Sequence, residues 1–180
     1  MEHGMVWGVK DSLLAYVEGL DDGAVATDAP AVRQGGGFAF PLVTAGAAEL
    51  RVADEAGGVA AGFGGGLRFQ GSVRLTGHWG MLDVELRDPR AELRGAKATL
   101  LIRERGGRDP EAALPFADLT LAAVSADDGL LCLEYAAALT GQGGFLLGGQ
   151  YPAGQELEPV RLTLPDPGAA ERPGERDRRA

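Results

Sequence analysis

The chain has 180 residues, which is enough for one domain with its own hydrophobic core and too few for two domains of ordinary size. Its 29 glycines and 10 prolines argue against a helical bundle, whereas a hydrophobic content of 45% is too high for a wholly disordered chain. The formal net charge of −9 opposes binding to nucleic acid, which needs clustered Lys and Arg side chains. The composition therefore predicts a mainly β protein that does not bind nucleic acid.

The N-terminal part of the chain predicts one short helix. Residues 11–19 begin with residues that can cap a helix, continue with apolar and aromatic side chains at helical spacing, and end at a glycine. Residues 21–37 are polar and turn-rich, so we expect a loop there. Strands are predicted at 38–43 and 48–53.

The clearest periodicity of the chain lies in its middle third. Apolar and polar side chains alternate along 67–76, which predicts one half-buried strand, and the alternation resumes along 82–87 after a turn at 77–80. These segments predict a β-hairpin. The meander is expected to continue through two further strands at 91–93 and 98–102.

The C-terminal part predicts more strands. Residues 105–112 form a charged loop in this interpretation, and residues 1–164 form a single domain followed by a mobile tail over 165–180. The segment 130–140 is ambiguous between a strand that ends near Tyr135 and a helical turn over 136–139. The remaining segments are an expected strand at 116–124, an apolar patch within 141–149 and a last strand at 160–164.

The sequence contains neither a signal peptide nor a stretch of about 20 apolar residues that could span a bilayer. We therefore expect a soluble protein without membrane insertion, cytoplasmic as the sequence stands, or secreted or at the cell surface if a leader has been removed. The single cysteine, Cys132, cannot form an internal disulfide and lies in an apolar run, so we expect a buried structural thiol.

Few residues can carry chemistry. The run of glycines at 62–66 lacks the Lys-Ser/Thr ending of a phosphate loop and predicts a hairpin turn or bulge instead. A zinc site is improbable because His3, His78 and Cys132 are the only His and Cys residues. Tyrosinate, in contrast, is a hard anionic ligand that suits ferric iron, and a neighbouring histidine can donate the hydrogen bond that keeps the phenolate ionised. The chain has three candidates for such a ligand: Tyr16, Tyr135 and Tyr151.

Three blocks of sequence resemble the HtaA-domain family, the haem-binding modules of haem uptake in Gram-positive bacteria. The first block is WGVKDSLLAYV at 7–17, and the second is VRLTGHWGMLD at 73–83 with DPR at 88–90. The third is GGQYPAG at 148–154, continued over 157–160. The blocks follow one another in the order found in the family and span most of the chain.

The resemblance implies a role for three residues. In the family, the tyrosine of the first block is the axial ligand of haem iron, the histidine of the second donates a hydrogen bond to it, and the tyrosine of the third supports haem binding. The matching positions are Tyr16, His78 and Tyr151. The implied cofactor is ferric haem b, held in a sandwich-like antiparallel β fold with one or two short α-helices at the pocket. Tyr135 and His3 match no family position, so we interpret them as a core residue and a mobile terminus.

A haem pocket also needs apolar walls and a cation for the propionates. Arg68 or Arg74 could meet a propionate. Candidate wall residues are the apolar side chains of the first helix and large side chains of the three blocks, namely Trp7, Leu13, Val17, Trp79, Met81 and Phe145.

The favoured hypothesis is therefore a protein without enzymatic activity that transports, transfers or stores haem, with haem donors or other haem carriers as partners. One alternative is a haem-dependent enzyme, a peroxidase or a haem-degrading protein, but it would need a distal acid or base and no second histidine is evident. The other is a β interaction module that binds no haem and uses its Tyr and Trp side chains at a protein interface.

Overall fold

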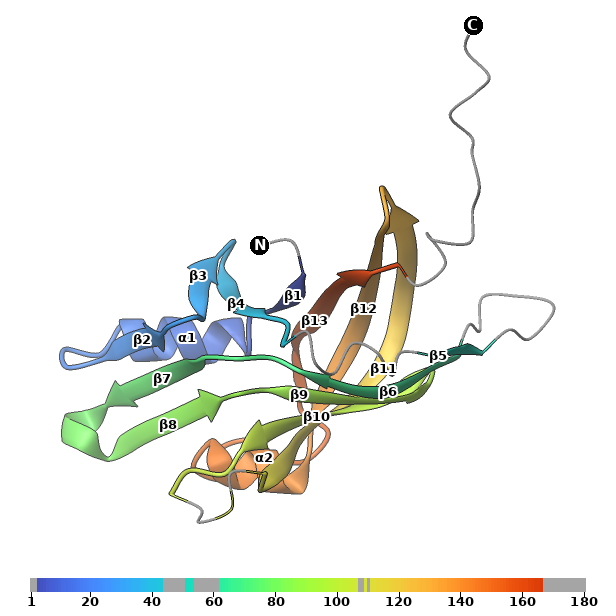
Figure 1. Cartoon of the computed structure of the whole chain (residues 1–180). Coiled ribbons are helices and arrows are strands. Elements are labelled where there is room, and N and C mark those ends of the chain that lie inside the picture. Colours follow the sequence, from blue (N-terminus) through green and yellow to red (C-terminus); the bar gives the residue numbers. More distant parts are fainter. Residues whose placement is uncertain (1–2, 44–50, 54–61, 107–108, 110, 167–180) are drawn as a thin grey trace, which may run out of the picture.

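The computed structural model describes residues 3–43, 51–53, 62–106, 109 and 111–166, and its strands form two antiparallel sheets (Figure 1). Two short α-helices accompany the sheets, α1 (Asp11–Glu18) and α2 (Gly141–Leu146). The predicted fold class, mainly β with antiparallel sheets and short helices, is confirmed. No helix in the described ranges is long and apolar enough to cross a membrane.

The larger sheet joins the two halves of the chain. Its strand β13 is the last in the described sequence, yet it pairs with the first strand on one side and with β12 on the other. In spatial order the sheet contains β3 (Val32–Gln34), β4 (Gly37–Pro41), β1 (Gly4–Trp7), β13 (Glu156–Pro165), β12 (Leu130–Leu139), β11 (Ala113–Asp127), β10 (Lys97–Arg103), β9 (Arg90–Gly95), β6 (Gly62–Arg68) and β5 (Arg51–Ala53).

The smaller sheet lies beside α1 and contains three strands, β2 (Ala24–Asp28), β7 (Ser72–Gly77) and β8 (Leu82–Arg87), with β7 in the middle. Helix α1 contacts β2 and β7 and buries its apolar face there. The β7–β8 hairpin runs out from the larger sheet, as Figure 1 shows, and its tip lies at the end of the molecule that also holds α1.

The predicted continuous strand at 67–76 is wrong, because the chain passes from one sheet to the other within it. Strand β6 ends at Arg68 and β7 begins at Ser72. Between them Gly71 has a φ of +112°, and a Cβ there would lie 2.5 Å from the backbone nitrogen of Ala31. Only glycine fits this position, and the alternating pattern continues across the break because both strands bury one face.

The glycine run at 62–66 is not the expected hairpin turn or bulge but most of strand β6. Its residues pair in register with β9, from Phe63 opposite Gly95 to Arg68 opposite Arg90. Phe63 and Leu67 supply the buried side chains of this strand. A run of glycines is typical of a turn, but strand pairing uses backbone hydrogen bonds, which glycine forms as other residues do.

Other elements differ from the sequence-based expectations. The predicted loop at 21–37 contains β2 and β3, and the ambiguous segment 130–140 is the single long strand β12. The apolar patch within 141–149 begins as α2, where the Thr140 side chain accepts a hydrogen bond from the Gly143 N–H at 2.9 Å and so caps the helix. Much of the predicted strand at 48–53 and most of the predicted tail, from residue 167 onward, lie outside the described residues.

The core is continuous across both sheets and α1. Trp7 is fully buried, packs edge-on against Phe116 with ring centroids 5.4 Å apart, and donates a hydrogen bond to the Glu158 carbonyl. Tyr135 is fully buried, as expected of a core residue. Cys132 is only partly buried, contrary to expectation, because it lies on the other face of β12 with its Sγ 3.9 Å from the Thr163 hydroxyl.

Replacement of Tyr135 by Phe is expected to leave the fold intact and to raise the free energy of unfolding by up to about 1 kcal/mol. The Tyr135 hydroxyl is buried and has no hydrogen-bond partner among the described residues, so the substitution removes an unsatisfied polar group. Urea denaturation at neutral pH measures the change. A loss of more than about 1 kcal/mol would contradict the absence of a partner.

Burial also raises the pKa of Tyr135 to about 12. Since the unfolded value is near 10 and burial disfavours the phenolate in the folded state, the stability of the protein is unaffected by the ionisation of this group below about pH 10 and falls as the pH rises toward 12. The ultraviolet absorbance of tyrosinate should therefore include a titration near pH 12 that is absent from the Tyr135→Phe variant.

Candidate functional site

Helix α1 presents Tyr16 beside its buried face, at the exposed edge of the helix. Leu13, Leu14 and Val17 pack into the core at the spacing of one helical face, whereas 51% of the Tyr16 side chain remains exposed. The helix ends at Gly19, whose N–H donates to the Ala15 and Tyr16 carbonyls. Tyr16 therefore lies on a short helix that is anchored in the core, with about half of its own side chain exposed.

His78 lies at the tip of the β7–β8 hairpin, at the start of a 3₁₀ turn over His78–Gly80. His78 and Trp79 both adopt left-handed backbone conformations, with φ values of +51° and +52°. Such conformations are uncommon for residues other than glycine and cluster at functional sites. The tip therefore holds the histidine in a backbone conformation that ordinary turns avoid.

The Tyr16 hydroxyl and Nε2 of His78 are 2.5 Å apart, although the residues are separated by 62 positions in the chain. Their ring centroids lie 5.8 Å apart. With a neutral phenol, Tyr16 donates its proton to Nε2; with a phenolate, a protonated Nε2 donates to the Tyr16 oxygen. The same geometry therefore serves both charge states of the tyrosine.

This pair opens into a cleft of about 590 Å³, a volume within the range of small-molecule and cofactor sites. Helix α1, the hairpin tip and the segment after α2 supply its walls. The cleft residues are Leu13, Tyr16, His78, Met81, Leu82, Leu147, Gly148, Gln150 and Tyr151.

Tyr151 reaches the same cleft from the segment between α2 and β13. Its ring packs partly against the core, and the Lys10 ammonium lies 5.8 Å from the ring centroid. In the described part of the chain no hydrogen bond joins Tyr151 to Tyr16 or His78. The structure thus brings all three sequence-predicted site residues to one cleft and directly connects two of them.

Several residues expected at the pocket lie elsewhere. Trp7 and Val17 are fully buried in the core, and Trp79 and Phe145 are exposed without lining the cleft; of the expected wall residues, Leu13 and Met81 do line it. His3 is not a free terminus, since its carbonyl accepts a hydrogen bond from the Leu42 N–H at 3.2 Å.

Neither arginine expected to meet a propionate lines the cleft. Arg74 pairs with Asp83 at 2.8 Å on the exposed side of the hairpin, and Arg68 pairs with Glu111 at 2.8 Å. The sequence interpretation missed the nearer cation, Lys10, because a lysine just before a helix carries no pattern that ties it to a tyrosine about 140 residues later. It also missed Leu147, which lies next to the third block, and Gln150, which lies within it.

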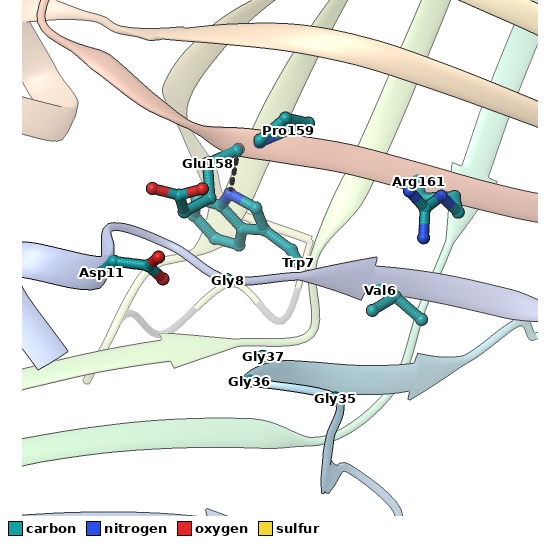
Figure 2. A pocket seen from close by; sticks show the side chains of 10 residues that line it. All are labelled: Val6, Trp7, Gly8, Asp11, Gly35, Gly36, Gly37, Glu158, Pro159 and Arg161. Atoms are coloured by element: carbon teal, nitrogen blue, oxygen red, sulfur yellow. Dashed lines mark hydrogen bonds between the residues drawn. The ribbon is translucent and has the colours of Figure 1, made fainter.

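A second depression, of about 250 Å³, lies at the junction of β1, β4 and β13 and is shown in Figure 2. Trp7 is one of the residues that line it, and its indole donates to the Glu158 carbonyl at 3.1 Å. The carboxylates of Asp11 and Glu158 lie on one side of it, and Arg161, at the other end, pairs with Glu134. This depression contains no tyrosine or histidine, and its carboxylates disfavour an anionic ligand.

Ion pairs fasten the two strands of the hairpin close to its tip. The Asp83 carboxylate accepts two hydrogen bonds from Arg74, at 2.8 and 2.9 Å, and lies 2.8 Å from Arg105. These contacts hold the pKa of Asp83 well below its usual range, and the hydrogen bonds from Arg74 have the largest effect. Asp83 pairs with Thr76 in the β7–β8 ladder, next to the last pair before the tip. The network therefore stabilises the strand ends that carry His78.

The fold and the cleft define a small β domain with a Tyr–His pair at a ligand-sized opening. The family model described as Htaa matches residues 2–163, which is most of the chain. The chain therefore belongs to the HtaA family, and the resemblance seen in the three sequence blocks is confirmed. No curated protein matches the sequence.

Solved structures with the same fold come from Corynebacterium glutamicum. The N-terminal domain of HtaA is 26% identical, with a TM-score of 0.70, over 92% of this chain and 97% of that domain. The C-terminal domain of HtaA is 20% identical, with a TM-score of 0.68, over 90% of this chain and 94% of that domain. The heme binding protein HtaB is 21% identical, with a TM-score of 0.64, over 90% of this chain and 91% of that protein.

Replacement of Asp83 by Asn is expected to destabilise the protein at neutral pH and to destabilise it less in acid. The lowered pKa means that the ion pairs stabilise the folded state fully above the unfolded pKa, near 4, and that this contribution decreases progressively as the pH falls from there toward the lowered pKa of the folded state. Urea denaturation at about pH 7 and about pH 3 measures both effects.

Asp118→Asn is the matched control, because Asp118 forms no ion pair with a described residue and the substitution removes the same charge. An equal loss of stability in both variants at neutral pH would show that the Asp83 network contributes nothing specific.

Proposed function

We propose that this protein binds ferric haem b in the cleft beside α1 and serves in haem transport, transfer or storage. In this proposal residues 1–164 act as one haem-binding domain, the Tyr16 oxygen is the axial ligand, His78 donates a hydrogen bond to it, and Tyr151 supports the pocket. Haem supplies a ferric iron that accepts an axial oxygen ligand. The HtaA family membership and the fold shared with the heme binding protein HtaB support this function.

The observation that carries the proposal is the 2.5 Å contact between the Tyr16 hydroxyl and Nε2 of His78 at the edge of the cleft. A phenolate oxygen is a hard donor that suits ferric iron, and a protein uses it at neutral pH only if the charge is stabilised. A histidine N–H directed at the oxygen provides that stabilisation and fixes the orientation of the ring. The exposed side chain leaves Tyr16 accessible to a ligand entering the cleft.

The chemistry of the cleft walls fits a flat apolar macrocycle. Leucine and methionine side chains from α1, the hairpin and the segment after α2 provide apolar contact, and the tyrosine and glutamine side chains add polar groups at the edge. This mixture, mostly apolar with a few directed polar groups, is typical of cofactor sites.

A carrier is favoured over an enzyme by the same residues. His78 is the only histidine among the residues that line the cleft, and its Nε2 is engaged by Tyr16. A peroxidase or a haem-degrading enzyme needs a further acid or base on the open side of the iron, and the cleft residues include no carboxylate. Reversible binding needs no such group.

Replacement of Tyr16 by Phe is expected to abolish the Soret shift seen on titration with hemin, or to weaken hemin affinity by more than about 100-fold. The loss should exceed the roughly 10-fold to 100-fold effect of residues that act through a ligand, because the substitution removes the proposed ligand atom itself. The phenyl ring is retained, so the packing of the side chain should not change. An absorption titration of the purified protein measures it.

Tyr135→Phe is the control for this experiment, since Tyr135 is fully buried and does not line the cleft. It should bind hemin as the unmodified protein does. Equal hemin affinity and equal spectra for the Tyr16→Phe variant and the unmodified protein would refute the ligand assignment, and a protein that gives no saturable spectrum would refute haem binding itself.

Lys10 is the cation placed to meet a propionate. It immediately precedes α1, its ammonium lies 5.8 Å from the Tyr151 ring centroid, and it donates one long hydrogen bond of 3.4 Å to the Glu156 carbonyl. No residue lining the cleft is an arginine or a lysine, and the net charge of −9 repels the two propionates of haem. Lys10, close to the Tyr151 ring, can offset that repulsion.

Replacement of Lys10 by Met should weaken hemin binding on the order of fivefold, because an exposed ion pair contributes at most about 1 kcal/mol. Hemin dimethyl ester, whose propionates carry no charge, should bind equally to both proteins. Lys97→Met is the control, since the other lysine of the chain lies on β10 with its ammonium 2.8 Å from the Thr120 hydroxyl. Identical effects at both lysines would reduce the role of Lys10 to net charge.

A further inference from the structure

We propose that Asp22 is a positioning residue for His78, a role that rests on the proposed function of the Tyr16 and His78 pair. The Asp22 carboxylate accepts two backbone hydrogen bonds from the hairpin tip. Its Oδ1 accepts from the His78 N–H at 3.0 Å, and its Oδ2 accepts from the Trp79 N–H. Both carboxylate oxygens therefore bind consecutive residues of the turn that carries the histidine.

The turn needs this support because its backbone is strained. His78, Trp79 and Gly80 have φ values of +51°, +52° and +88°, and the first two have side chains that disfavour this region. The Trp79 side chain is 83% exposed, so its burial does not compensate the strain. Two charge-assisted hydrogen bonds to adjacent N–H groups stabilise this conformation directly.

Asp22 also connects the hairpin tip to the helix that bears Tyr16. The segment between them continues from α1 through hydrogen bonds, since the Leu20 N–H donates to the Val17 carbonyl at 3.2 Å and the Gly23 N–H donates to the Leu20 carbonyl at 3.1 Å. Leu20 in turn packs closely over Gly77, where an added Cβ would lie 2.6 Å from its Cδ1. The carboxylate is thus fixed to α1 and holds the tip against it.

These contacts give Asp22 a role in the geometry of the proposed iron ligand. The Tyr16 hydroxyl meets Nε2 of His78 only if the hairpin tip keeps both its backbone conformation and its distance from α1. Asp22 controls both through one side chain. It lines no part of the cleft, so it would act on haem through His78 and not by contact.

The experiment compares Asp22→Ala with Asp21→Ala. Asp21 is the adjacent acid, is exposed and makes no described hydrogen bond, so its removal changes the charge without touching the turn. We expect Asp22→Ala to weaken hemin affinity about tenfold and Asp21→Ala to leave it unchanged, as is typical of residues that orient a metal ligand through its neighbours. Asp22→Asn should fall between them, because its single carbonyl oxygen can accept one of the two N–H groups.

A double-mutant cycle with His78→Ala tests the route of the effect. If Asp22 acts by placing His78, its removal should cost nothing further once the imidazole is absent. A loss of hemin affinity that persists undiminished in the His78→Ala background would overturn the proposal, because Asp22 would then act by another route.

A measurement without haem separates this inference from the proposed function. The chain has two histidines, so the ring signals of His78 in a labelled apoprotein can be assigned with a His3→Ala variant. Asp22→Ala and Asp22→Asn should each shift the His78 signals toward those of a free imidazole, while Asp21→Ala leaves them in place. Unchanged His78 signals in both Asp22 variants would overturn the positioning role even if the protein binds hemin, whereas failure of the unmodified protein to bind hemin would overturn the function alone.

Discussion

The candidate site depends on a single polar contact, the 2.5 Å hydrogen bond between the Tyr16 hydroxyl and Nε2 of His78. Tyr16 belongs to an eight-residue helix and His78 to a hairpin tip, so the contact forms only if both elements are fixed in place. The helix is anchored by three buried side chains, whereas the tip is held by ion pairs along the hairpin and by backbone hydrogen bonds to one carboxylate. Packing fixes one member of the pair and electrostatics fixes the other.

Much of the fold could be predicted from local patterns, because half-buried strands and an amphipathic helix leave a readable period in the sequence. The β8 strand and α1 are close to their predicted positions. The errors arise where local pattern and tertiary role diverge. The alternation across Gly71 suggested one strand, but its positive φ directs the chain into another sheet, and the glycines of β6 resembled a turn although backbone pairing alone places them in the larger sheet.

The site shows a different limit. Tyrosine and histidine are suited to ferric iron by their chemistry, but composition could not select Tyr16 over the buried Tyr135; the family resemblance made that selection. The structure adds what neither source contained, the contact of Lys10 with Tyr151 and the two hydrogen bonds that Asp22 accepts from the hairpin tip. Both link residues far apart in sequence through one side chain. An isolated lysine or aspartate has no periodic signature, so such contacts become visible only once the sheets are in place.

Strand β13 carries a consequence for how the protein is made. It is the last described strand, yet it lies between β1 and β12, and the Trp7 indole beside α1 donates to its Glu158 carbonyl. During synthesis, β1 is made well before β13, so one edge of β1 stays unpaired until β13 is available. Pairing between strands so far apart in sequence slows folding and leaves strand edges exposed in the meantime. Strand β1, which leads into the helix that carries Tyr16, therefore gains its β13 neighbour only after Glu156–Pro165 has been synthesised.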